Sequence, residues 1–156
     1  MQRAWKYALA VLGCEAVGSI GALFVRPSAL AWYGALARPS FAPPNWLFAP
    51  VWILLYALMG VALVLMLERR QPKHDRLESE TWFYAQLALN GLWTPVFFGL
   101  ESPWLGLVVI VALWCALAGT ILRFEKISKP AGWLLVPYLA WVSYALLLNF
   151  AIWRLN

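Results

Sequence analysis

Five long apolar runs constrain this chain more than any other feature of its sequence. They cover residues 7–25, 46–67, 81–100, 104–122 and 133–153. An α-helix needs about 20 apolar residues to cross the hydrocarbon core of a bilayer, and each run has roughly that length. A helix satisfies its own backbone hydrogen bonds in lipid, and no run shows the alternation of a membrane barrel strand. The sequence therefore predicts an all-α membrane protein, a bundle of five transmembrane helices forming a single domain over residues 1–156.

The composition leads to the same fold class. Hydrophobic residues make up 63% of the chain and charged residues only 12%, whereas soluble domains are about 25% charged. A chain of 156 residues could not hide that much apolar surface in one core. The basic start and the small residue before Cys14 loosely match a cleaved lipoprotein signal, but the apolar run continues to Val25. That continuation favours a transmembrane helix.

The basic residues predict an orientation for the bundle. One side of the predicted membrane carries nine of them: Arg3, Lys6, Arg69, Arg70, Lys73, Arg76, Arg123, Lys126 and Lys129. The other side carries three: Arg26, Arg38 and Arg154. Cytoplasmic loops carry the excess of lysine and arginine, so we expect a multi-pass protein with its N-terminus inside. The cations are divided among short membrane-flanking loops, so we do not expect nucleic acid as a partner.

The first connection, residues 26–45, is built differently from a simple linker. Residues 32–46 read WYGALARPSFAPPNW, with three prolines, four large aromatic residues and a single charge, Arg38. Proline fixes its own backbone torsion and stiffens such a segment. We therefore expect this loop to be a lid over a ligand site on the outer side.

Tryptophan is unusually frequent, and its positions separate into two groups apart from Trp32, which lies in the first connection. Six of the eleven lie at helix ends, where indole rings anchor in the headgroup layer. Four lie inside the runs: Trp52, Trp93, Trp114 and Trp141. Tyr56, Asn90, Tyr138, Ala145 and Asn149 share helix faces with members of this second group. These faces predict an aromatic cavity that opens toward the lid, although large rings can also simply fill the space between helices.

Polar residues inside the runs have two interpretations each. Asn90 can donate a hydrogen bond to a ligand or bridge two helices. Glu15, the only acid within a run, is either a protonated core residue bonded to Ser19 or another helix, or a proton or cation site. The two cysteines lie in separate runs and the only histidine, His74, lies in a charged connection. We therefore expect no metal site, and the sequence carries no recognisable cofactor motif.

Four segments together are more specific than any of these patterns. WYGALARPSFAPPNW, PVWILLYALMG, LALNGLWTPVFFG and GWLLVPYLAWVSYALLLNFAIWRLN closely resemble the TspO/translocator protein family of tryptophan-rich sensory proteins. The resemblance covers nearly the whole chain. It implies a five-helix bundle, often a homodimer, with a pocket beneath the first loop that binds porphyrins such as protoporphyrin IX.

By position, the resemblance implies a set of ligand-binding residues. They are Tyr33, Phe41, Trp52, Tyr56, Asn90, Trp93, Tyr138, Trp141 and Ala145. Two departures stand out, because many relatives carry tryptophan at Phe41, and animal relatives carry tyrosine where this chain has Phe150. The second departure weakens any expectation that a sterol binds at Arg154.

Three functions are consistent with these residues. The leading hypothesis is a membrane receptor or carrier for porphyrins and similar hydrophobic ligands. The second is a light-dependent, porphyrin-degrading enzyme that uses Trp52 and Trp141, because some bacterial relatives are similar in this respect. The third is a small proton-coupled exporter that uses Glu15. The sequence leaves the physiological ligand and the oligomeric state open.

Overall fold

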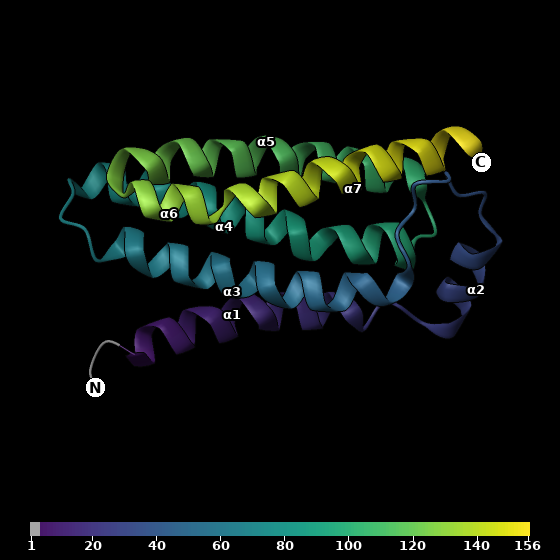
Figure 1. Cartoon of the computed structure of the whole chain (residues 1–156), viewed down its shortest axis with the longest axis horizontal. Coiled ribbons are helices and arrows are strands. Elements are labelled where there is room, and N and C mark those ends of the chain that lie inside the picture. The colour runs from purple at the N-terminus through teal and green to yellow at the C-terminus, as the bar shows by residue number, and fades with distance from the viewer. Residues whose placement is uncertain (1–3) are drawn as a thin grey trace.

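The computed structural model describes residues 4–156, and the backbone of that range is helical or irregular, without strands. Arg3, which contributes to the predicted orientation, lies outside the described residues. The α-helices are α1 (Ala4–Ala22), α2 (Pro27–Ala35), α3 (Phe48–Leu67), α4 (Lys73–Thr94), α5 (Pro103–Ile127), α6 (Lys129–Leu134) and α7 (Val136–Leu155). A short 3-10 turn, Asn45–Leu47, precedes α3, and a π-helical turn, Pro95–Gly99, extends α4. The all-α class predicted from the sequence is confirmed (Figure 1).

Three helical stretches are long and apolar enough to cross a membrane, namely Asn45–Leu67, Pro103–Ile127 and Lys129–Leu155. The pair α1 and α2, bent by 75°, counts as a fourth if it is one broken span. The remaining long helix, α4, begins before its predicted apolar run, which starts at residue 81. The first two turns of α4 carry charged residues such as Asp75 and Arg76 and are not part of that run. The five predicted spans thus correspond to α1, α3, α4 with its π-turn, α5, and α6 with α7. Their number within a bilayer stays a prediction.

The helices pack side by side as a bundle with the lid at one end. Helix α1 lies against α3 and α4, and α5 lies against α4 and α7. Figure 1 shows the lid with α2 at the end opposite the α3–α4 and α5–α6 connections. The connections that carry most of the basic residues therefore lie together, as the charge pattern predicted. The lid is more ordered than a stiff loop, since half of it is the helix α2.

The end of α6 determines where the bundle opens. Helix α6 packs on both α3 and α5, whereas α7 packs mainly on α5. Leu135 lies between the two helices, and Pro137 follows in the first turn of α7. Proline lacks a backbone donor, so one helical hydrogen bond is missing here, although Lys129–Leu155 continues as a single stretch. Toward the lid, α7 separates from α3 (Figure 1).

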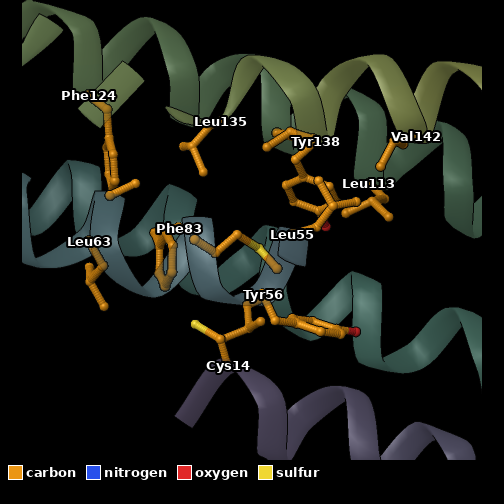
Figure 2. Close-up of a cluster of buried hydrophobic side chains, with 14 of the residues drawn as sticks. Cys14, Leu55, Tyr56, Leu63, Phe83, Leu113, Phe124, Leu135, Tyr138 and Val142 are labelled. Carbon is orange, nitrogen blue, oxygen red and sulfur yellow. The ribbon is translucent and has the colours of Figure 1, made fainter. Parts of the chain in front are cut away.

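The hydrophobic core fills the half of the bundle away from the lid. Its largest fully buried side chains include Phe83, Phe124, Met59, Leu117 and Tyr138. Phe83 and Phe124 stack with ring centroids 5.8 Å apart, and Figure 2 shows them at one end of the cluster, with Tyr56 and Tyr138 at the other. This half is closely packed, and the cavity described below lies in the half beneath the lid.

Small residues allow the helices to approach one another. A Cβ atom at Gly60 would lie 2.5 Å from the backbone nitrogen of Val11, so α1 and α3 touch at their backbones. Gly18 faces the ring of Tyr56 in the same way. Thr120 on α5 is fully buried within the chain. These three small residues therefore lie at contacts within one chain.

Candidate functional site

A cavity of about 600 Å³ lies beneath the lid. Its walls come from α1, α3, α4, the π-turn, α5, α7 and the lid itself. The volume falls within the range of about 300–1,000 Å³ that is usual for small-molecule sites. The separation of α3 from α7 leaves this space open.

Seven of the nine predicted site residues line the cavity: Tyr33, Trp52, Tyr56, Asn90, Trp93, Trp141 and Ala145. The other two do not. Tyr138 is completely buried beneath the cavity floor. Phe41 is 50% exposed and packs against Tyr144, with ring centroids 6.4 Å apart, so it holds the lid from outside. The fourth interior tryptophan, Trp114, also lies outside the lining and donates to Ser143 instead.

Asn90 is the centre of a buried polar cluster at the cavity floor. Its Oδ1 accepts a hydrogen bond from the Tyr56 hydroxyl, and its Nδ2 donates to the Tyr138 hydroxyl at 2.6 Å. The three residues belong to α4, α3 and α7, and Asn90 is only 5% exposed. Asn90 therefore bridges helices, as one of the two interpretations predicted, and a hydrogen bond from Asn90 to a ligand stays a prediction. The amide fixes the floor and holds the Tyr56 ring in the cavity wall.

Trp93 is held on its edge and on its face. Its Nε1 donates to Oδ1 of Asn149 at 3.1 Å, and Nδ2 of Asn149 donates to the carbonyl of Pro103 at 2.8 Å. Phe97 stacks on the indole with centroids 4.9 Å apart and an interplanar angle of 19°. The π-turn that begins at Pro95 brings both Phe97 and Phe98 into the lining.

Trp52 and Trp141 come from α3 and α7, the two helices that separate beneath the lid. The ring of Trp52 lies 6.0 Å from that of Tyr138 in an edge-to-face arrangement, and Trp141 meets Phe48 in the same way at 5.9 Å. Aromatic pairs of this geometry each stabilise a structure by about 0.5–1.5 kcal/mol beyond their buried area. The buried Nε1 of Trp141 has no hydrogen-bond partner among the described residues.

The lid is fastened to α7 at two points. The side chain of Asn156 donates to the carbonyl of Ala37 at 3.0 Å and accepts from its amide at 2.9 Å. The Tyr144 hydroxyl donates to the carbonyl of Phe41 at 2.8 Å. These bonds hold the lid over the cavity.

Aromatic contacts from α2 complete the roof. Trp32 packs edge-on against Phe97 at 5.6 Å, and the Arg38 guanidinium lies 5.5 Å from the centroid of the Tyr33 ring. Burial raises the pKa of the Tyr33 phenol, an effect that the nearby Arg38 charge partly offsets. The phenol therefore stays neutral at physiological pH.

Sequence reasoning missed part of the lining. Phe97, Phe98 and Leu148 line the cavity without having been predicted. Phe97 follows Trp93 by four residues, a spacing that places both on one face of a regular helix. Pro95 lies between them and is expected to interrupt the regular helix, so this spacing alone does not predict that Phe97 lines the cavity. Among residues 4–156, no group of three or more histidine, cysteine, aspartate or glutamate side chains is arranged to hold a metal ion.

Comparison with known proteins identifies the family. The model of the TspO/MBR family matches residues 10–154. The chain belongs to this family. It is 46% identical to the tryptophan-rich protein TspO of Chlorobaculum tepidum over 149 residues, which cover 96% of this chain and 94% of that one. It is 36% identical to the human translocator protein over 146 residues, covering 93% of this chain and 84% of the relative.

A third relative is the tryptophan-rich sensory protein of Cereibacter sphaeroides. It is 38% identical over 157 residues, covering 100% of this chain and 95% of the relative. Family membership and the long apolar helices together make this chain an integral membrane protein. The many exposed large hydrophobic side chains, such as Leu12, Ile20 and Leu147, are accordingly the surface that contacts lipid.

Proposed function

We propose that this protein is a membrane receptor or carrier that binds porphyrins and similar flat hydrophobic ligands in the cavity beneath the lid. The observation that carries the proposal is the placement of Trp52, Trp93 and Trp141 around one space of about 600 Å³. Indole faces stack on flat conjugated rings, and the apolar walls favour a hydrophobic ligand over water. The resemblance noted in the sequence supports protoporphyrin IX as the first ligand to test.

Titration of the detergent-solubilised protein with protoporphyrin IX, followed by tryptophan fluorescence quenching, tests this function. Replacing both Trp52 and Trp141 with leucine should weaken binding at least about tenfold, since each ring contributes on the order of 1 kcal/mol and 1.4 kcal/mol is tenfold. The matched control replaces Trp5 and Trp133, which are 54% and 65% exposed and lie outside the cavity lining. Equal affinity in the wild type and the Trp52/Trp141 double variant would refute the pocket.

A second candidate function is light-dependent porphyrin degradation. It is favoured by one observation, namely that Trp52 and Trp141 both line the cavity from opposing helices. Illumination of the porphyrin complex should then yield a new absorbing product in the wild type and none in Trp52→Phe. Loss of porphyrin at the same rate in protein-free micelles would rule out catalysis.

The third hypothesis, proton-coupled export, depends on Glu15, which lies in the cavity lining on α1. Reconstituted vesicles with an imposed pH gradient should accumulate the ligand with the wild type and fail to do so with Glu15→Gln. Undiminished uptake by that variant would exclude a coupled exporter.

For the assembly in the membrane, we infer a homodimer with the N-terminus inside. The outer face of α1 supports this inference, because a Cβ atom at Gly13 would meet no other atom of the described chain within 4 Å. That open surface leaves room for a second copy to approach closely. Cross-linking in the native membrane tests the dimer.

A further inference from the structure

One face of α1 carries the only charged side chain that the described residues contribute to the cavity. Glu15, Gly18, Ser19 and Ala22 all line it, and their spacing of three, four and seven residues places them on one side of the helix. Gly18 lies against the Tyr56 ring. Glu15 lies one turn before Gly18, and its charge acts on the Tyr56 phenol, so the carboxyl group lies near that hydroxyl on the α1 side of the cavity.

Among residues 4–156, this carboxyl group has no partner. Glu15 forms no hydrogen bond or ion pair with the described residues, and the cavity lining that they form includes no lysine, arginine or histidine. The titratable groups near it are Cys14 on the same helix and Tyr56 on α3, neither of which carries a positive charge. A carboxylate within the membrane requires a proton or a cation to offset its charge.

The hydrogen-bonding groups beside it are already used. Tyr56 donates to Asn90, and Asn90 donates to Tyr138, so these phenols and this amide are directed toward one another. Among the described residues, no side chain donates to the Glu15 oxygens, and the Ser19 hydroxyl, one turn away in the same lining, forms no hydrogen bond with them. The floor of the cavity therefore presents one free acceptor beneath an aromatic slot.

We infer that Glu15 forms a subsite for a protonated amine, so that the cavity prefers flat hydrophobic ligands carrying a cationic group. This inference rests on the proposed function, because the ring of the ligand would occupy the space between Trp52 and Trp141. A cationic substituent would point to the floor and pair with the Glu15 carboxylate. Acidic substituents would point to the lid, where Arg38 lies over Tyr33.

Two tetrapyrroles of the same ring system test the subsite. The first is protoporphyrin IX dimethyl ester, which is neutral, and the second is a protoporphyrin IX diamide whose two side chains end in primary amines. Both are titrated at pH 7 in a non-ionic detergent, with tryptophan quenching as the readout. A primary amine is protonated at this pH.

The wild type should bind the diamine at least about tenfold more tightly than the ester, because a hydrogen bond to a charged group adds at least the free energy of a tenfold change in affinity. Glu15→Gln should abolish this preference, so that the variant binds the diamine and the ester with equal affinity. The control, Glu125→Gln, removes an exposed acid outside the cavity and should retain the preference.

The outcomes separate the two proposals. Equal affinity of the wild type for both ligands, or a preference that persists in Glu15→Gln, would overturn the subsite and leave ring binding intact. Failure of the wild type to bind either ligand would overturn the subsite together with the porphyrin-binding function.

Discussion

Replacing Asn90 with leucine should destabilise the bundle by about 2–4 kcal/mol, and the structure indicates where the loss arises. Leucine has the same number and branching of side-chain heavy atoms but cannot hydrogen-bond, so the Tyr56 and Tyr138 hydroxyls both lose their partner. Tyr138 is fully buried, and a buried polar group without a partner costs about 1–3 kcal/mol. Tyr56 lines the cavity, where water can replace the lost bond, so its share should be nearer the average of about 0.6 kcal/mol measured for hydrogen bonds in a membrane protein.

The assay is equilibrium unfolding in mixed micelles, with Tyr138→Phe as the second arm of a double-mutant cycle. In the Asn90→Leu background, Tyr138→Phe removes the orphaned hydroxyl and should recover part of the lost stability. In the wild-type background the same change leaves Nδ2 of Asn90 unpaired and should destabilise. Strictly additive effects of the two substitutions would refute the polar bridge. Near-native stability of Asn90→Leu with greatly weakened ligand binding would instead assign Asn90 to the ligand.

Further predictions concern the lid and the helix contacts. Asn156→Ala removes two hydrogen bonds to Ala37, each worth about 0.5–1.5 kcal/mol. This variant should raise the ligand dissociation rate about tenfold in stopped-flow measurements. An unchanged rate would show that the hydrogen bonds between Asn156 and Ala37 do not hold the lid. Gly60→Ala should destabilise by about 1–3 kcal/mol because the new methyl group meets the Val11 backbone. Gly13→Ala is the matched control, since Gly13 has open space around it; equal unfolding free energies for the two variants would contradict the close α1–α3 contact.

Some parts of the site could be predicted from the sequence because they depend on helix periodicity alone. Trp52 and Tyr56 share a face at any helix orientation, and so do Asn90 and Trp93. Both pairs line the cavity. Tyr138 and Trp141 belong to one stripe by the same rule, but their rings end at different depths, one in the core and one at the cavity wall.

Other parts could not be predicted because they depend on how separate helices meet. The sequence cannot state that Asn156 and Ala37, 119 residues apart, are hydrogen-bonded, nor that Phe41 packs outside the lid on Tyr144. The π-turn at Pro95 likewise brings Phe97 and Phe98 into the lining. Each of these features arises from a local backbone departure or from a long-range contact.

The sequence by itself determined that this chain is a helical membrane protein with rings concentrated in particular faces, because hydrophobic length and a 3.6-residue period are local properties. Only the tertiary structure decided that a cavity exists. That outcome depends on where the helices meet, since α6 packs on α3 whereas α7 packs mainly on α5. Rings that could have filled a core therefore surround an open space, and its lining includes the Glu15 carboxyl group, which has no partner among the described residues.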